Sequence, residues 1–172
     1  MWYVIQTITG KEAETVKVID KVLEKGSYER CFVIQRECVW RIEGQCRVHI
    51  EPFFPSYVFV ETDTPEDFFF ALKRVPKLTK LLGSEGVFWS VQREDIVLLK
   101  KLIGSDSEYI VRRSLVEVDP VGEIVAAEGV LNEYISKIIR KRLRKRVVVV
   151  EIPFLGEVRR IQLGVRLAGD EE

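Results

Sequence analysis

A short stretch of small and polar residues, Gly104-Ser105-Asp106-Ser107-Glu108, divides the chain into two parts of different character. Before it, runs typical of β-strands alternate with runs typical of amphipathic helices. After it, short β-rich runs such as Val147–Val150 are separated by turn residues, a pattern that indicates a small barrel. The 172 residues suffice for two small domains. We therefore predict domains over residues 1–103 and 114–172, joined by a linker over 104–113.

The N-terminal part predicts the element order β-α-β-β-β-α-β-α. Residues 2–8 are aromatic and β-branched and favour a strand, and Thr9 with Glu12 has the spacing of a capping box before a helix over 11–25. The other expected elements are strands within 30–50 around a turn at Glu43-Gly44, a strand over 56–62, a helix that starts at Pro65, and a helix that Ser90 caps and Gly104 ends. The expected fold class is α+β: an α/β sandwich with helices on one side of a mainly antiparallel sheet, then a small β-barrel.

The balance of charge limits where a nucleic acid could bind. The chain has 27 basic and 27 acidic side chains, so a generally basic surface is excluded and any such site must come from local clustering. No run approaches the roughly 18 apolar residues that a membrane span needs. The N-terminus also lacks the basic segment and apolar stretch of a signal peptide. We expect a cytoplasmic protein without a membrane partner.

Residues suited to catalysis or metal binding are few. The single histidine, His49, lies in a predicted strand, and Cys46-x-x-His49 with Cys38 upstream lacks a fourth ligand nearby, so ordinary strand residues are the favoured interpretation. Cys31, Cys38 and Cys46 are expected as free thiols. No phosphate-binding glycine loop and no nucleophile with an adjacent base is visible. We therefore expect no enzyme, no cofactor and no metal.

The run from Phe53 to Glu61 is apolar on both sides. In a strand, alternate side chains point to opposite faces, which places Phe54 with Val58 on one face and Tyr57 with Phe59 on the other. Helices would cover only one face, so the second face exposes its aromatic rings unless a partner covers it. Burial by the chain's own hairpin or second domain is the alternative, and the pattern does not separate the two.

The run from Lys137 to Arg146 concentrates positive charge, because seven of its ten residues are basic and none is acidic. Arginine suits phosphates since its planar fork forms two parallel hydrogen bonds, so we favour nucleic-acid contact over a merely solvated hairpin. The predicted contacts are Lys137, Arg140, Lys141, Arg142, Arg144, Lys145, Arg146, Arg159 and Arg160. Apolar residues between 131 and 143 also have helical spacing, but Val147–Ile152 needs a pairing partner. We favour strands, with a helical turn near 131–136 left open.

Four segments of the chain together resemble the NusG family, in which an NGN domain precedes a KOW domain. They are Trp2-Tyr3-Val4-Ile5-Gln6-Thr7 with Gly10 and Glu12, the run Phe53-Phe54-Pro55-Ser56-Tyr57-Val58-Phe59-Val60, Val75-Pro76 with Leu82-Gly83, and the stretch from Gly122 through Gly129 to Gly156. The resemblance covers nearly the whole chain and implies an SH3-like barrel as the second domain. It also implies that the first domain binds the clamp helices of RNA polymerase through an apolar patch, to which Tyr57 and Phe59 correspond, with Phe53 beside them.

Departures from the housekeeping pattern point within the family to a specialised member. The turn Gly129-Val130-Leu131, Ser136 in place of a glycine, and the dense basic run are most similar to LoaP antiterminators, which implies binding of a structured leader RNA hairpin. The alternative is a housekeeping elongation factor whose KOW domain binds ribosomal protein S10 or Rho. A ribosomal or RNA-processing KOW protein is a third reading, against which the run Phe53–Phe59 argues.

Two further expectations concern partners. The pair Lys73-Arg74 ends the second predicted helix and corresponds to a region of the paralogue RfaH that touches displaced non-template DNA. Favourable charge at a helix C-terminus is an equally good explanation of that pair. We expect the protein to be a monomer.

Overall fold

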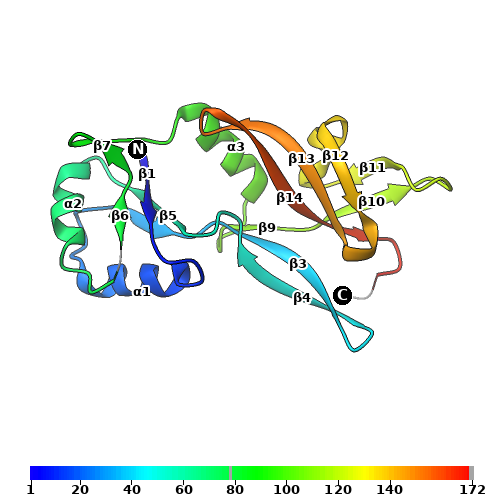
Figure 1. Ribbon diagram of the computed structural model, residues 1–172, viewed down its shortest axis with the longest axis horizontal. Coiled ribbons are helices and arrows are strands. Elements are labelled where there is room, and N and C mark those ends of the chain that lie inside the picture. The colour runs from blue at the N-terminus through cyan, green and yellow to red at the C-terminus, as the bar shows by residue number, and fades with distance from the viewer. Residues whose placement is uncertain (78, 171–172) are drawn as a thin grey trace. The chain divides into compact units, whose positions relative to one another are not determined.

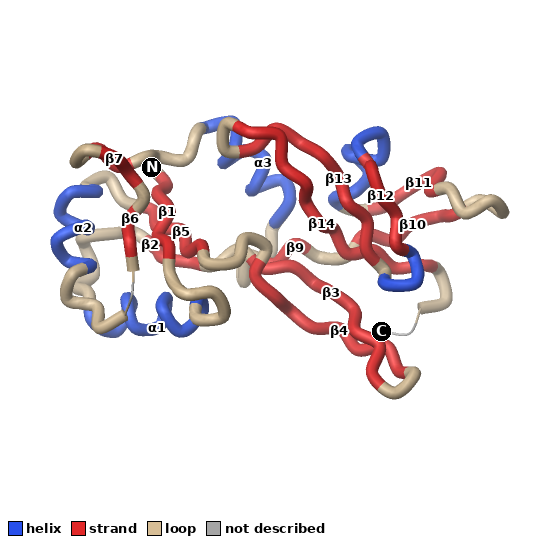
Figure 2. The backbone as a smooth tube through the Cα atoms, in the orientation of Figure 1, coloured by secondary structure: helices blue, strands red, loops and turns tan. Residues whose placement is uncertain are grey.

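The computed structural model describes residues 1–77 and 79–170, and it divides into two compact units (Figures 1 and 2). The first unit comprises Met1–Ile34 and Pro52–Val97. The second comprises Gln35–Glu51 and the chain from Leu98 onward. The segment 35–51 is therefore compact with the C-terminal residues. The predicted domains, by contrast, are continuous stretches of the chain that end at residue 103 and begin again at 114. Those boundaries stay a prediction.

The first unit is built on a four-stranded antiparallel sheet in the order β2-β5-β1-β6. Its elements are β1 (Trp2–Gln6), α1 (Glu12–Val22), β2 (Arg30–Phe32), β5 (Tyr57–Glu61), α2 (Pro65–Leu72), β6 (Lys80–Leu81), β7 (Gly83–Ser84) and β8 (Val87–Phe88). Ile5 lies opposite Val58 across the β1–β5 ladder, so both point to the same face. That face packs against Ile19 of α1 and Phe68 of α2, all four side chains being fully buried. The helices therefore cover this face of the sheet, as predicted.

The start of α1 differs from the predicted capping box. The helix begins at Glu12 after Lys11, and no side chain caps it. The Glu12 carboxylate instead lies buried and accepts hydrogen bonds from the backbone N–H of Gly10 at 3.1 Å and of Ser56 at 2.7 Å. The hydroxyl of Thr9 pairs with that of Ser56. The predicted capping box is wrong because Thr9 and Glu12 both bind Ser56, in the turn before β5, instead of each other's backbone.

The second unit contains a hairpin of β3 (Gln35–Ile42) and β4 (Gln45–Pro52), and β9 (Ile110–Val111) adds to β3 in parallel. The turn lies at Glu43 and Gly44, whose φ angles of 53° and 77° are those that two-residue hairpin turns need. The predicted hairpin is therefore confirmed. Helix α3 (Arg93–Ile103) ends before Gly104, which adopts a φ of 63° as an αL residue at a helix end does. Its predicted end is confirmed too.

A five-stranded sheet in the order β11-β10-β14-β13-β12 forms the rest of the second unit and curls into a half-barrel (Figure 2). Its strands are β10 (Ser114–Val118), β11 (Ile124–Glu128), β12 (Ile138–Arg142), β13 (Val147–Phe154) and β14 (Glu157–Leu167). Only the β10–β14 pair is parallel. Alternate β13 residues Val148, Val150 and Ile152 are buried, which fixes the register of the sheet. The predicted α+β class is thereby confirmed.

The ambiguous segment before β13 is resolved in favour of a strand. Residues Val130–Lys137 form a 3₁₀ helix, η1, and Leu143–Lys145 form a single 3₁₀ turn, η2, on the other side of β12. Strand β12 pairs along β13, which satisfies the backbone of both. The preference for strands over 137–146 and the helical turn left open near 131–136 are both confirmed, because pairing with β13 outweighs helical spacing.

Candidate functional site

The structure gives the basic side chains of β12 two different directions. Arg140 lies opposite Val149 and Arg142 opposite Val147, whereas Lys141 lies opposite the buried Val148. Opposed residues share a face of a sheet, so Arg140 and Arg142 point to solvent and Lys141 points to the inner side. Lys141 Nζ is 2.5 Å from Glu123 Oε1 and 3.3 Å from the Gly122 carbonyl oxygen. The unpaired positive charge of β12 therefore lies on its outer face.

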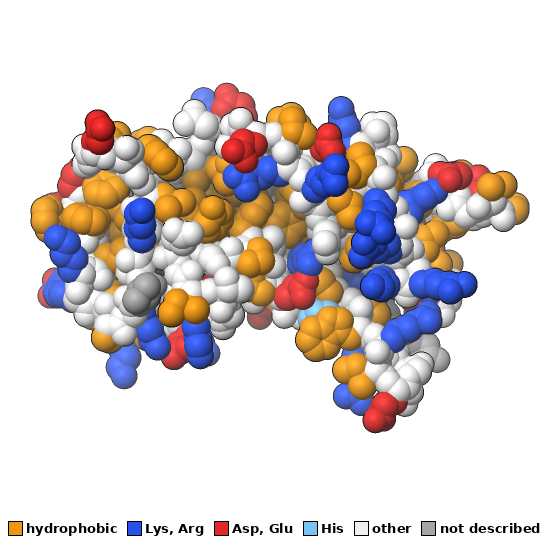
Figure 3. All heavy atoms as spheres, viewed as in Figure 1, with side chains coloured by type: hydrophobic (Ala, Val, Ile, Leu, Met, Phe, Trp, Pro, Cys, Tyr) orange, Lys and Arg blue, Asp and Glu red, His pale blue; other side chains and the backbone are white. Residues whose placement is uncertain are grey.

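The outward side chains gather around a shallow hollow. Its lining consists of Gly122, Arg140, Lys141, Arg142, Leu143, Arg144 and Lys145. Figure 3 shows Lys and Arg side chains clustered over β12 and η2. Within the described part of the chain, five exposed cations of this segment have no acidic partner: Lys137, Arg140, Arg142, Arg144 and Lys145. We call these five residues the basic patch. Like charges this close repel one another, so an anion would stabilise them.

Arg146 belongs to the same basic run but has a structural role. Its Nε and Nη2 donate to the two Asp170 carboxylate oxygens, each at 2.7 Å, and Nη1 donates to the Leu143 carbonyl. The side chain is only 17% exposed. The hydrogen bonds from Arg146 hold the pKa of Asp170 below its ordinary value. Arg146 thus closes the η2 turn rather than facing solvent.

The two predicted contacts on β14 are placed differently from each other. Arg160 is exposed and pairs with Glu151, two residues along β13 from Val149, so it lies on the same face as Arg140. Its Nε is 3.6 Å from the Glu151 carboxylate. Arg159 lies opposite the buried Ile152 and donates to the Phe154 carbonyl at 3.2 Å. The structure therefore brings Arg160 to the face of the basic patch and turns Arg159 away.

The aromatic run before and in β5 is more buried than expected. Phe59 is fully buried, and its ring lies 5.8 Å from that of Phe32, 5.9 Å from that of Phe54 and 6.3 Å from that of Trp2. Of the two alternatives that the pattern left open, burial by the chain's own residues therefore holds for Phe59. Phe54 also lies on the Phe59 side, contrary to simple alternation. The reason is Ser56, whose φ of 73° turns the chain so that alternation starts only at β5.

Tyr57 and Phe53 are half-buried and remain partly open to solvent. Tyr57 lies two residues before Phe59 on β5 and shares its face. The N–H of Tyr57 donates to the Phe54 carbonyl at 3.1 Å, and the neighbouring Ser56 amide is held by Glu12. Hydrogen bonds therefore fix the backbone at Tyr57, the first residue of β5.

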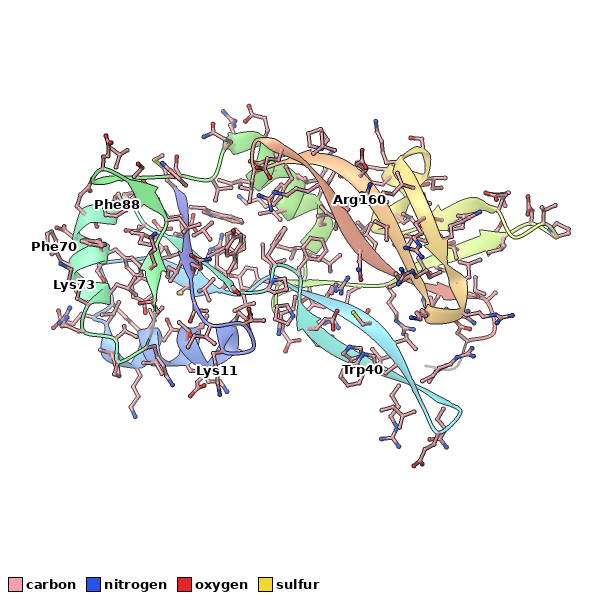
Figure 4. All side chains as sticks on the ribbon, in the orientation of Figure 1. Lys11, Trp40, Phe70, Lys73, Phe88 and Arg160 are labelled. Carbon is pink, nitrogen blue, oxygen red and sulfur yellow. The ribbon has the colours of Figure 1, made fainter. Side chains whose placement is uncertain are left out.

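The pair Lys73-Arg74 directly follows α2, and both side chains are exposed. Lys73 Nζ lies 4.8 Å from the ring centre of Phe69 and 5.0 Å from that of Phe70, and Figure 4 shows Lys73 beside Phe70. Phe70 is 64% exposed. The exposed ring was missed in the sequence, although three consecutive phenylalanines in one helix cannot all face the same core.

Comparisons with known proteins agree with this architecture. The family model "Transcription termination factor nusG" matches residues 1–100. A "Transcription termination/antitermination protein NusG" of Treponema pallidum is 30% identical over 94 residues, which span 49% of this chain and 51% of that relative. The protein of the same name from Pasteurella multocida is 23% identical over 168 residues, covering 94% of this chain and 90% of the relative. The match to the Treponema relative thus spans only about half of its length.

A solved structure shows a similar fold. The structure titled "Domain interaction in Thermotoga maritima NusG" superposes with a TM-score of 0.54, at 19% identity, over 95% of this chain and 92% of that chain. At this identity the likeness supports the fold alone. Among the helices of the described residues, none has the length and apolar character to cross a membrane.

Proposed function

The chain belongs to the NusG family of transcription factors, and we propose that it is an antiterminator that docks on RNA polymerase and grips a structured leader RNA. Its relatives are termination and antitermination factors rather than enzymes. The first unit would bind the polymerase clamp helices, and the basic patch would bind the RNA. The same proposal places it in the cytoplasm as a monomer.

The basic patch is the observation that carries the RNA proposal. Four of its five cations, Arg140, Arg142, Arg144 and Lys145, line one hollow, in a chain whose net charge is zero. The described residues supply no carboxylate that pairs with these cations. RNA phosphates would supply the negative charge. Shape and phosphate contacts would dominate, because the major groove of A-form RNA is too narrow for side chains to read.

The test is a charge reversal in the basic patch. Arg142→Glu with Arg144→Glu should weaken binding to the leader hairpin by about two orders of magnitude or more, since two phosphate contacts become repulsive. Gel shifts would compare the hairpin, a linear RNA of the same length and duplex DNA. Lys21→Glu with Lys25→Glu is the matched control, because these exposed residues at the end of α1 carry the same charge change in the first unit. Unchanged affinity of the patch variant for the hairpin would remove the RNA role.

The housekeeping alternative has support of its own, because the curated relatives carry the plain NusG name. In that case the second unit would bind a protein such as ribosomal protein S10 or Rho, and RNA affinity would be weak and indifferent to RNA structure. Equal binding of hairpin and linear RNA, together with capture of purified S10 or Rho, would favour this alternative.

For polymerase docking, we infer different roles for the three predicted residues, because they differ in burial. Tyr57 and Phe53 are half-open and would contact the clamp helices, while the buried Phe59 would support the surface from beneath. Tyr57→Ala should therefore lose polymerase pull-down while the unfolding temperature stays near that of the native chain. Normal pull-down by this variant would exclude the assignment.

Contact with non-template DNA is proposed for the Lys73-Arg74 pair, aided by the exposed ring of Phe70 on which a base could stack. A crosslinker at position 74 in a stalled elongation complex should reach the displaced strand. The same crosslinker at Lys25 serves as the control. Equal yields from the two positions would argue against the contact.

A further inference from the structure

The hairpin of β3 and β4 gathers metal-binding side chains on one of its sides. Alternate residues of a strand share a face. On this face, Trp40 of β3 contacts His49 of β4, and Arg36 of β3 contacts Glu51 of β4. Cys38 lies between Arg36 and Trp40 on β3 and is buried. One thiol, one imidazole and one carboxylate, from Cys38, His49 and Glu51, therefore meet at the centre of this face.

The distances fit a single small ion. One potential ligand atom from each of Cys38, His49 and Glu51 lies within 4.8 Å of the other two. His49 Nε2 is 3.3 Å from Glu51 Oε2. Two ligands of a tetrahedral zinc ion, each about 2.0–2.1 Å from the metal, are separated by roughly 3.3 Å. The sulfur needs to move by only about an ångström to complete the set.

The surroundings orient these side chains. Arg36 binds the second Glu51 oxygen, Oε1, and also donates to Gln162, so Oε2 is left turned toward His49. The indole of Trp40 covers the His49 ring with 3.7 Å between ring centres. Partners that hold ligating carboxylates and imidazoles in place are a regular part of metal sites. Among the described residues, His49 Nδ1 is buried and has no hydrogen-bond partner, so the ring is held by Trp40 and Glu51 rather than by a hydrogen bond to this nitrogen.

We propose that Cys38, His49 and Glu51 form a site for a divalent transition metal, best suited to zinc, with water as the fourth ligand. The mixed sulfur, nitrogen and oxygen set is one that zinc accepts in tetrahedral geometry. The thiolate is the ligand, so the ion displaces the thiol proton to solvent. With Arg36 present, the thiolate and carboxylate leave a net charge of minus one for the dication to meet. The ion would join β3 to β4 across the hairpin.

This arrangement differs from the one that the sequence suggested. The spacing Cys46-x-x-His49 drew attention to Cys46, but that residue is exposed and does not join the cluster. Glu51 was missed because a carboxylate two residues from a histidine is unremarkable until alternation places both on one face. Cys46 is useful as a built-in control, since it is a second cysteine on the same hairpin.

The proposal is tested by titrating the metal-free full-length protein with Co²⁺. One equivalent should produce the visible bands of tetrahedral cobalt with a thiolate charge-transfer band in the near ultraviolet, and Zn²⁺ should abolish both. Zinc should also raise the unfolding temperature, because an ion that binds only the folded state stabilises it. Absence of a thiolate band at several equivalents of Co²⁺ would overturn the proposal.

Variants identify the ligands. Cys38→Ser should remove the thiolate band, His49→Gln should lower the affinity at least tenfold, and Cys46→Ser should leave the titration unchanged. Circular dichroism verifies that each variant folds, and the native titration remains decisive if Cys38→Ser does not. A band that survives in Cys38→Ser but disappears in Cys46→Ser would place the metal elsewhere and refute the site.

Discussion

At the scale of single residues, not every basic residue of the sequence contributes unpaired charge to the surface. The basic run contains seven cations, but Lys141 is paired with Glu123 and Arg146 with Asp170. The sequence predicts where positive charge concentrates. It does not predict these pairings, because Asp170 lies 24 residues from Arg146 and meets it only through the pairing of β13 with β14.

The Arg146–Asp170 pair predicts a pH dependence of stability. Because Arg146 lowers the pKa of Asp170 in the folded state, the pair's stabilisation is fully present above the unfolded value of about 3.9 and is lost as pH falls through the lower folded value. Asp170→Asn should lower the free energy of unfolding by about 1–3 kcal/mol at pH 7. It should also make stability depend less on pH below about 3.9. Thermal unfolding from pH 7 to pH 2 measures both. Glu157→Gln, which breaks a 3.5 Å exposed pair, is the control and should change little.

At the scale of elements, strands and helices are more predictable than the places where they begin. The apolar pattern predicted the strand over 56–62, but the left-handed Ser56 starts it at Tyr57 and reverses the side of Phe54. Glu12 was predicted to cap its own helix and instead ties α1 to this turn. The second difference comes from a contact between residues 44 positions apart, which local pattern does not contain.

Glu12→Ala tests that tie. It leaves the Gly10 and Ser56 amides without their buried acceptor, which should destabilise the protein by about 2–4 kcal/mol. If Tyr57 needs the turn to be fixed, polymerase affinity should fall further than in Glu14→Ala, an exposed neighbour on the same helix. Chemical denaturation and pull-down measure the two effects. Equal stability of the two variants would show that the buried carboxylate is dispensable.

Close packing of β14 against β3 gives a second test at this scale. A Cβ at Gly164 would lie 2.5 Å from the Glu37 carbonyl oxygen, a backbone atom that cannot move aside alone. Gly164→Ala should therefore destabilise the protein by about 1–3 kcal/mol through overpacking. Val158→Ala, at an exposed position of the same strand, should be nearly neutral. The denaturant midpoints of the two variants decide the matter.

At the scale of the whole molecule, the fold class and the basic run follow from sequence pattern. The element order does so only in part, because the described residues place four strands rather than three between α1 and α2, and three short strands rather than one between α2 and α3. The grouping of residues does not follow from that pattern: the segment Gln35–Glu51 is compact with the chain from Leu98 onward, at least 47 positions away. The place of Glu51 beside Cys38 and His49 was not apparent because it depends on how β3 and β4 face each other, whereas the basic patch, which is contiguous in sequence, was apparent. Sites built from one segment are predictable, and sites built across strands need the fold.

The whole-molecule prediction is the salt dependence of RNA binding. If all five cations of the basic patch neutralise one phosphate each, the logarithm of the binding constant should fall with the logarithm of salt concentration at a slope of about −3.5 to −4.5. Arg142→Ala with Arg144→Ala should reduce the magnitude of the slope by about 1.4–1.8, because two counterion-releasing contacts are lost. Arg146→Ala should lower stability without a comparable change in slope, since its guanidinium is held by Asp170. Fluorescence anisotropy with labelled leader hairpin between 50 and about 300 mM salt, a range over which such slopes resolve, measures all three. A slope near zero for the native protein would mean that the patch does not bind phosphates, and the charge would then need another anionic partner.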